Sequence, residues 1–271
     1  MTSLRAGRVR LNVERLGAPG DTGRPVVVLV HGLGPDSLAG YYLTIAAGVA
    51  AAGHGVVMYD QRGHGRSERP ATGYRLEDFT ADLRNLLDAL GIHRPVVLVG
   101  NSFGGAVAID FAVRHPHRVS RILLIESAPL TGDWPQRMSG FLSHCAKTFR
   151  DAQETDRLEK DHGWFAARLA RRTRPLLEET TLIEDIAVSR VPGEDGLRSL
   201  AVPVLALYGA DSSLAASAPA LENLLPYCRT VVVPGQGHTL LVDAPRTVGA
   251  LLLGWLGEDL NRPVRPRTRT S

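Results

Sequence analysis

The sequence has few cysteines and few lysines. Its 271 residues contain two cysteines, Cys145 and Cys228, which lie far apart in the chain. Two isolated cysteines supply neither a disulfide framework nor the closely spaced pairs of a metal-binding motif. We therefore expect unreactive thiols and no metal site. Lysine occurs only at positions 147 and 160 while arginine, alanine, glycine and leucine are abundant, a composition typical of a GC-rich bacterial genome.

Long apolar runs are also missing. No uninterrupted apolar stretch approaches the roughly 20 residues that a membrane-spanning helix needs, and the chain has no internal repeats or low-complexity blocks. The N-terminal residues alternate polar and apolar side chains, whereas a secretory signal has an apolar core and a small-residue cleavage site. The sequence therefore predicts a soluble, cytoplasmic protein with no membrane partner.

Most of the chain also has almost no net charge. The formal net charge is +3, but arginines 262, 265, 267 and 269 lie in the last residues, NRPVRPRTRTS, which leaves −1 for the rest. Proteins that bind nucleic acids usually gather basic residues on one face or one helix. We therefore expect no nucleic-acid partner and interpret residues 261–271 as a basic, disordered tail.

What the sequence does contain is a regular alternation of two patterns. Short runs rich in Val, Ile and Leu occupy residues 25–30, 55–60, 95–100, 120–126, 202–208 and 229–233. They lack alternation with period two, as expected for strands that are buried on both faces of a parallel sheet. Helical patterns lie at residues 41–52, 76–90, 103–114, 218–225 and 245–256. With an antiparallel-looking strand at residues 9–15, the sequence predicts an α/β fold with a doubly wound, mostly parallel sheet.

The alternation is interrupted once, between residues 131 and 197, where no strand-like run appears. Phe141, Leu142, Cys145 and Phe149 have helical spacing, so we expect a helical insertion after the strand that ends at Glu126. Helices inserted there would cover the carboxyl ends of the strands, where open α/β sheets bind ligands. We therefore predict a core domain of residues 1–130 and 198–260, with a helical lid of residues 131–197.

Ser102 is the candidate nucleophile. The pattern Gly100-x-Ser102-x-Gly104 follows an apolar strand and opens a helix. This is the context of a nucleophile elbow, in which the turn is so tight that the residues two before and two after the nucleophile must be small. The context favours a reactive serine over an inert serine in a glycine-rich turn.

A reactive serine needs a base, normally a histidine that is held by a carboxylate. His238 is the best candidate, because it follows the last strand-like run in a glycine-rich loop. We expect Asp211, which follows the strand ending at Tyr208, to orient His238, with capping of the next helix as its alternative role. Glu126 is the rival acid at another strand end, although we favour a contact with the lid or the substrate for it.

Acyl transfer places negative charge on a carbonyl oxygen, which two backbone N–H groups usually stabilise. In an elbow, one donor is the residue after the nucleophile, here Phe103. The other comes from the loop after an early strand, here Leu33 in the motif HGLG at residues 31–34. We expect His31 to brace this loop rather than to act as a base.

Five motifs then follow one another in an order that resembles the α/β-hydrolase superfamily: HGLG, YDQRGHGRS at residues 59–67, GNSFGG, YGAD and GQGH. The resemblance covers residues 9–256, and Ser102, Asp211 and His238 stand in the order that this family shows. It implies a serine triad, no cofactor, loop-bracing roles for Asp60, Arg62 and His64, and a helical lid after the sixth strand of the fold. The dehalogenase and epoxide-hydrolase branches have an aspartate nucleophile, so Ser102 disfavours those activities.

We therefore expect a serine hydrolase that cleaves a carboxylic ester, thioester or lactone, as a monomer or homodimer. C–C bond hydrolysis, cyclisation or elimination on the same scaffold is the alternative, and a non-catalytic ligand receptor is a remoter one. Trp134, Phe141 and Trp164 of the predicted lid either pack against the sheet or line a substrate pocket. The arginines at 168, 171, 172 and 174 form a solvated helix face or attract an anionic partner, such as an acyl carrier protein that delivers a thioester in secondary metabolism.

Overall fold

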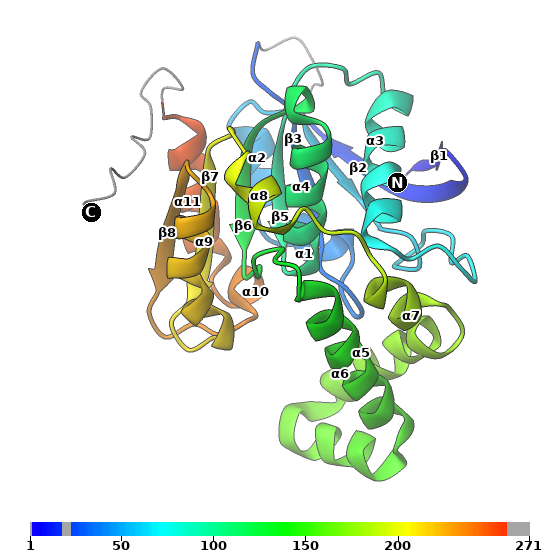
Figure 1. Cartoon of the computed structure of the whole chain (residues 1–271). Coiled ribbons are helices and arrows are strands. Elements are labelled where there is room, and N and C mark those ends of the chain that lie inside the picture. The colour runs from blue at the N-terminus through cyan, green and yellow to red at the C-terminus, as the bar shows by residue number, and fades with distance from the viewer. Residues whose placement is uncertain (1, 18–22, 259–271) are drawn as a thin grey trace.

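The computed structural model describes residues 2–17 and 23–258. Eight strands form one sheet in the order β1-β2-β4-β3-β5-β6-β7-β8 (Figure 1). Their bounds are β1 Thr2–Ala6, β2 Val9–Leu16, β3 Val27–Val30, β4 Val56–Tyr59, β5 Val96–Asn101, β6 Val119–Ile125, β7 Val204–Gly209 and β8 Cys228–Val233. The β1–β2 and β2–β4 pairs are antiparallel, and all the other pairs are parallel. The predicted doubly wound, mostly parallel sheet is confirmed, while the predicted tail at 261–271 lies outside the described residues.

Strand β1 adds to the predicted set. It pairs with β2 through a hairpin in which Ala6 lies opposite Val9. Gly7 in the turn has φ +63°, a conformation that glycine adopts without the steric cost of a side chain. The antiparallel strand predicted at residues 9–15 is therefore the second strand of a hairpin.

The central strands are apolar throughout because both faces of the sheet are covered. All four residues of β3 are buried, but they enter two different cores. Val28 and Val30 pack in a core with side chains of helices α3 and α4, whereas Val27 and Leu29 pack on the opposite face with side chains of α2 and α11. The runs without alternation in the sequence therefore have the physical cause that was expected.

The helices are α1 Leu38–Tyr42, α2 Ala46–Ala51, α3 Leu76–Ala89, α4 Phe103–Arg114, α5 Trp134–Arg150, α6 Ala152–Glu178, α7 Leu182–Ala187, α8 Gly193–Arg198, α9 Ala218–Leu224, α10 Leu240–Asp243 and α11 Pro245–Leu256. The helical pattern at residues 41–52 corresponds to two short helices, α1 and α2, rather than one. Between them, the Thr44 hydroxyl donates to the carbonyl oxygen of Gly40 at 2.5 Å. A hydroxyl bonded to the carbonyl four residues back commonly bends a helix.

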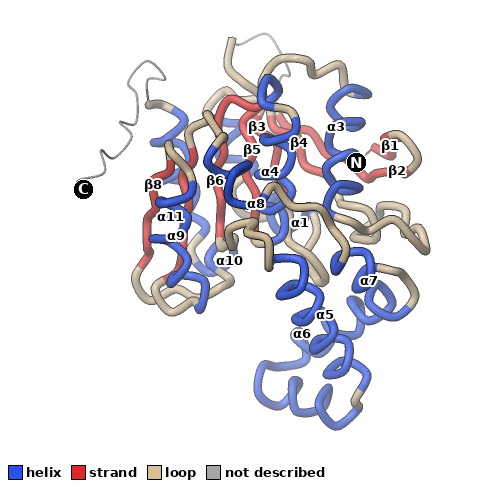
Figure 2. Tube along the Cα trace, viewed as in Figure 1, coloured by secondary structure: helices blue, strands red, loops and turns tan. Residues whose placement is uncertain are grey.

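The segment between β6 and β7 contains four helices, α5 to α8, and no strand within its described residues. Helices α5, α6 and α7 extend beyond one end of the sheet, while α8 lies beside α4 (Figure 2). Their position agrees with the predicted helical insertion, and the division into core and lid domains stays a prediction. Within the described ranges, no helix has both the length and the apolar character needed to span a membrane.

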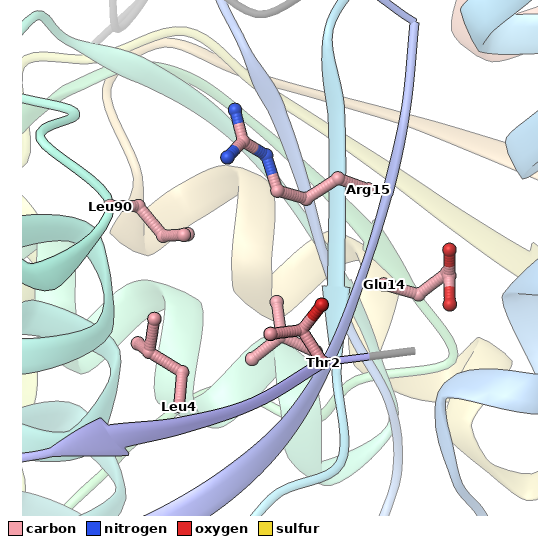
Figure 3. A pocket seen from close by; sticks show the side chains of 6 residues that line it. Thr2, Leu4, Glu14, Arg15 and Leu90 are labelled. Atoms are coloured by element: carbon pink, nitrogen blue, oxygen red, sulfur yellow. The ribbon is translucent and has the colours of Figure 1, made fainter.

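A cavity of about 240 Å³ lies against the β1–β2 hairpin (Figure 3). It is lined by Thr2, Leu4, Val13, Glu14, Arg15 and Leu90. Strands β4 and β3 separate this hairpin from β5 in the sheet. The cavity is therefore remote from the strand ends that carry the candidate nucleophile.

Candidate active site

Loops at the carboxyl ends of neighbouring strands carry the candidate residues. Ser102 directly follows β5, Glu126 directly follows β6, Asp211 lies two residues after β7, and His238 lies in the loop after β8. These four strands are consecutive neighbours in the sheet. Because parallel strands end at the same edge, the fold gathers residues that are far apart in sequence.

Ser102 lies in a strained turn between β5 and α4, with φ 50° and ψ −114°. Its N–H donates to the Ile125 carbonyl of the adjacent strand at 2.7 Å. A Cβ atom on Gly100 would collide with the backbone of Gly104, and one on Gly104 would collide with the Val30 carbonyl. The strand, the tight turn and the helix thus have the elbow geometry that the glycine spacing predicts.

The Glu126 carboxylate lies against His238. Its Oε2 atom is 3.1 Å from Nδ1 of His238, and the Glu126 side chain is fully buried while that of His238 is 54% exposed. The Gly209 N–H donates to Oε1 at 2.5 Å, and the Ser212 hydroxyl donates to Oε2 at 2.5 Å. Glu126 therefore reaches past the end of β7 to the histidine, and both of its oxygens are engaged.

These contacts determine the ionisation of Glu126. Burial raises the pKa of the carboxyl group, but the hydrogen bonds from His238, Ser212 and the Gly209 N–H outweigh burial and hold the pKa below its ordinary value. An ionised carboxylate on Nδ1 leaves Nε2 of His238 as the ring atom available for proton transfer and stabilises the imidazolium that forms.

Asp211 does not take the predicted position. Its N–H donates to the Gln236 carbonyl at 2.9 Å, and its side chain is exposed. The backbone is extended at Ser212, so neighbouring side chains point in opposite directions. With Ser212 directed at Glu126, Asp211 faces solvent. The expected pairing of His238 with Asp211 is therefore corrected to a pairing with Glu126, the rival acid.

The sequence pattern does not indicate that Ser212 contacts Glu126. Its hydroxyl also accepts the Leu214 N–H at 3.2 Å, as a serine before a helical turn commonly does. The contact with Glu126 joins residues 86 positions apart. A local pattern therefore reveals the cap but not the contact.

The two expected oxyanion donors follow neighbouring strands, with Leu33 in the loop after β3 and Phe103 directly after Ser102 at the end of β5. Phe103 is the first residue of α4, and a first helical N–H has no acceptor within its helix. Leu33 lies between two amides that are held by side chains: the Gly32 N–H donates to Asp36 at 2.7 Å, and the Gly34 N–H donates to Nε2 of His64 at 2.9 Å. The loop around Leu33 is thus fixed on both sides.

His31 and His64 brace this loop as neutral rings. His31 accepts the Gln61 N–H on Nε2 at 2.9 Å, so its Nδ1 donates to the Gly32 carbonyl at 2.6 Å. Burial, with a smaller contribution from the nearby His31, lowers the pKa of His64 to about 3. The predicted bracing position of His31 is therefore observed.

The motif at residues 59–67 is also held by internal bonds. Asp60 accepts the Leu38 N–H at 2.9 Å and the Asn12 side-chain amide at 2.8 Å, while Arg62 pairs with buried Asp82 at 2.7 Å. These contacts join the motif to β2, α1 and α3. They agree with the bracing roles that the resemblance implies.

The three aromatic residues of the insertion differ in environment. Trp134 is 2% exposed, and its ring centroid lies 6.1 Å from that of Phe103. Phe141 and Trp164 are 61% and 60% exposed, and Arg168 lies over the Trp164 ring at 5.8 Å. Trp134 therefore anchors α5 beside the elbow, while the other two face outward from the helices.

Metal-binding geometry is absent from the described part of the chain, in which no group of three or more His, Cys, Asp or Glu side chains is arranged to hold an ion. Cys145 and Cys228 are both free thiols, and burial raises the pKa of each.

Comparison with known proteins relates this chain to hydrolases. A family model described as the alpha/beta hydrolase fold matches residues 25–245. The 2-hydroxy-6-oxo-2,4-heptadienoate hydrolase of Pseudomonas putida is 41% identical over 121 residues, which is 44% of this chain and 42% of that relative, less than half its length. The provisionally named carbamate hydrolase RutD of Cronobacter turicensis is 27% identical over 86% of this chain and 91% of the relative. The enol-lactonase of Burkholderia xenovorans LB400 has a similar structure, with TM-score 0.76, 21% identity, and coverage of 95% and 100% of the two chains.

Proposed function

The chain belongs to the alpha/beta hydrolase fold family, and we propose that it is a serine hydrolase that cleaves a carboxylic ester, thioester or lactone through an acyl-enzyme. The observation that carries the proposal is the buried Glu126 carboxylate on Nδ1 of His238, at the strand edge where Ser102 stands on its strained turn. Nucleophile, base and orienting acid are the three groups that such chemistry requires.

In the proposed reaction, the Ser102 hydroxyl oxygen attacks the substrate carbonyl carbon while its proton moves to Nε2 of His238. The oxyanion accepts hydrogen bonds from the Leu33 and Phe103 N–H groups. Collapse of the tetrahedral intermediate breaks the bond to the leaving group, which takes the proton from His238. Water then attacks the acyl carbonyl carbon and gives a proton to His238, after which the bond to the Ser102 oxygen breaks, this oxygen takes the proton from His238, and the carboxylic acid leaves.

Glu126 is the proposed orienting acid. Its lowered pKa keeps it ionised at neutral pH, and the N–H of Gly209 and the hydroxyl of Ser212 fix its direction. Held in this way, the carboxylate selects the tautomer of His238 that carries a proton on Nδ1 and a lone pair on Nε2.

The insertion is proposed to complete the substrate pocket as a lid. Thr173 of α6 lies over the loop that carries Leu33, because a Cβ atom on Gly34 would be 3.2 Å from the Thr173 methyl group. Trp134 packs on the ring of Phe103, so α5 begins beside the other donor. Both halves of the proposed oxyanion hole thus touch the insertion, which favours a role in excluding water and shaping the acyl site.

The direct test is Ser102→Ala. We expect kcat for a short p-nitrophenyl ester to fall by about 10⁴- to 10⁶-fold, because only binding and the oxyanion donors remain. Circular dichroism should show that the variant is folded, and a fluorophosphonate should label the wild-type protein at Ser102 but not the variant. Turnover near the wild-type rate by folded Ser102→Ala would contradict the proposal.

Hydrolysis of a C–C bond is the second candidate, favoured by the name of the Pseudomonas putida relative. In that chemistry His238 is the essential base and Ser102 is secondary. A panel of esters, acyl thioesters, lactones and vinylogous diketones separates the two. If Ser102→Ala keeps diketone cleavage while losing ester hydrolysis, the second candidate holds.

A further comparison of thioester substrates tests which leaving group the enzyme prefers. Arg168, Arg171 and Arg174 are exposed on α6, and this charge favours an anionic partner such as an acyl carrier protein. If the natural substrate is a carrier-bound thioester, the carrier-bound acyl group should react faster than the same acyl group on a small thiol, and added salt should remove the difference.

A further inference from the structure

Asp36 links the two halves of the proposed oxyanion hole. It lies in the loop between β3 and α1, where its Oδ2 accepts the Gly32 N–H at 2.7 Å and the Asn101 side-chain amide at 3.1 Å. Gly32 directly precedes Leu33, and Asn101 directly precedes Ser102. One carboxylate oxygen thus joins the loop of one donor to the turn that carries the nucleophile and the other donor.

The surroundings hold this carboxylate in place. Its other oxygen, Oδ1, accepts the Ser37 N–H at 2.8 Å. A Cβ atom on Gly40 would lie 2.9 Å from Oδ1, and one on Gly32 would lie 3.1 Å from Oδ2. The carboxylate therefore fills space that two residues without side chains leave open.

Asp36 and His31 together fix the peptide groups on both sides of Gly32, the second of which carries the Leu33 N–H. His31 holds the Gly32 carbonyl while Asp36 holds the Gly32 N–H. In a trans peptide the C=O and the following N–H point in opposite directions, so fixing Gly32 on both sides directs the Leu33 N–H.

The Asn101 end of the link depends on Asp36 in turn. Asn101 Oδ1 is buried without a hydrogen-bond partner among the described residues, so the amide is oriented by its Nδ2 bond to Asp36. Loss of the carboxylate would leave Nδ2 without this acceptor as well.

We propose that Asp36 is a positioning residue that locks the Leu33 loop to the Ser102 turn and sets the spacing of the two oxyanion donors. This inference rests on the proposed function, because it concerns the stabilisation of an oxyanion during attack by Ser102. A donor that is displaced by a fraction of an ångström still allows substrate to bind but stabilises the transition state less.

The test measures kcat and KM for p-nitrophenyl butyrate, and the rate at which ethyl fluorophosphonate phosphonylates Ser102. We expect Asp36→Ala to lower kcat by about 10- to 100-fold with KM within about twofold, and to slow phosphonylation by a similar factor, since the P=O oxygen occupies the same hole. Asp36→Asn should lower kcat and the phosphonylation rate less, because the amide oxygen of the new side chain can still accept hydrogen bonds from the Gly32 N–H and the Asn101 side-chain amide.

A double-mutant cycle with Asn101→Ala tests the link itself. If Asp36 acts partly through Asn101, the two losses in kcat are not multiplicative, and the double variant is little slower than Asp36→Ala. The matched control is Asp88→Asn, which removes an exposed carboxylate paired with Arg118 at 3.0 Å and should keep wild-type kinetics. Thermal unfolding of each variant verifies that it is folded at the assay temperature, and if Asp36→Ala is not, Asp36→Asn and Asn101→Ala decide the question.

The inference is overturned if the folded Asp36 variants keep kcat within about twofold of wild type, if only KM changes, or if the losses multiply in the cycle. Ser102→Ala separates this failure from failure of the proposed function. Inactive Ser102→Ala with fully active Asp36 variants rejects the inference alone. Fully active Ser102→Ala rejects both.

Discussion

At the scale of single residues, backbone strain coincides with the candidate site. Among the described residues, Ser102 at φ 50° and Glu126 at φ 53° are the non-glycine residues with positive φ. Such conformations cost about 1–3 kcal/mol each and persist where surrounding contacts fix them. At Ser102 the strain belongs to the elbow, and at Glu126 it directs a carboxylate past the end of the neighbouring strand. Both residues with a strained backbone thus have a proposed role in the reaction.

The choice of acid is testable at this scale. Glu126→Gln keeps the shape of the side chain but removes the charge that stabilises the imidazolium, so we expect kcat for ester hydrolysis to fall by about 10³- to 10⁴-fold. Asp211→Asn is the matched control, because Asp211 is exposed and the carboxylate on His238 is Glu126. Its kcat should stay near the wild-type value. A large loss in Asp211→Asn with little loss in Glu126→Gln would restore Asp211 as the acid.

His64 makes stability depend on pH. Its folded pKa of about 3 lies below the ordinary value of 6.5, because burial disfavours the charged ring. Between these values the unfolded chain binds more protons than the folded one, so the free energy of unfolding decreases as pH falls from 6.5 toward 3. The contribution of His64 is up to about 1.4 kcal/mol per pH unit.

Urea unfolding at several pH values from 7 to 4 measures this slope. We expect His64→Gln, which keeps a donor and an acceptor, to have a shallower slope than wild type. His93→Gln changes an exposed histidine and serves as the control for removing a histidine elsewhere in the chain. Equal slopes for His64→Gln and wild type would show that His64 does not titrate with a lowered pKa.

At the scale of elements, a row of aromatic rings joins the insertion to the core. Phe79 of α3 lies 4.9 Å from Phe103 at the start of α4, and Phe103 lies 6.1 Å from Trp134 at the start of α5, measured between ring centroids. All three rings are buried. The start of α5 is therefore fixed to the helix whose first N–H is a proposed oxyanion donor.

Trp134→Ala should lower the free energy of unfolding by about 3–5 kcal/mol, because it leaves a cavity where a large buried ring was packed. Phe141→Ala truncates an exposed aromatic residue on the same helix and should change stability by less than about 0.5 kcal/mol. Denaturant unfolding measures both. Similar losses for the two variants would contradict the anchoring role of Trp134.

At the scale of the whole molecule, burial is unequally divided between the sheet and the insertion. Every residue of β3, β4 and β7 is buried. In α5, by contrast, the buried residues are Trp134, Pro135, Leu142 and Ala146 out of 17. Regions with few buried apolar contacts open at lower free energy than the core.

Native-state hydrogen exchange should therefore show two levels of protection. We expect amides of β3, β5 and β7 to exchange only through global unfolding, and amides in the second half of α5 to exchange through a smaller, local opening. Mass spectrometry of peptic fragments resolves the two regions. Equal protection in α5 and the central strands would indicate that sheet and insertion unfold as one unit.

Features set by neighbours in the chain could be predicted from the sequence. The central strands, the helices α3, α4 and α11, and the glycines around Ser102 have local physical causes: apolar runs, helical periodicity and the steric demands of a tight turn. The prediction of one helix at residues 41–52 was wrong, because the helix is interrupted between α1 and α2. At this break the Thr44 hydroxyl donates a hydrogen bond to the Gly40 carbonyl oxygen. Periodicity does not report such a bond.

The sequence by itself determined the fold class, the position of Ser102 in its turn, and the set of strand-end residues from which the remaining site is drawn. Only the tertiary structure decided which carboxylate meets His238. Glu126 and His238 are 112 residues apart, and their contact depends on the order β5-β6-β7-β8 and on the positive φ that directs Glu126 past β7. Asp211 stands in an equally suitable sequence context, but the backbone is extended at Ser212, and it is the Ser212 side chain, and not that of Asp211, that contacts Glu126. Side-chain direction after a strand end is set by the loops that pack together there, and no local pattern encodes that packing.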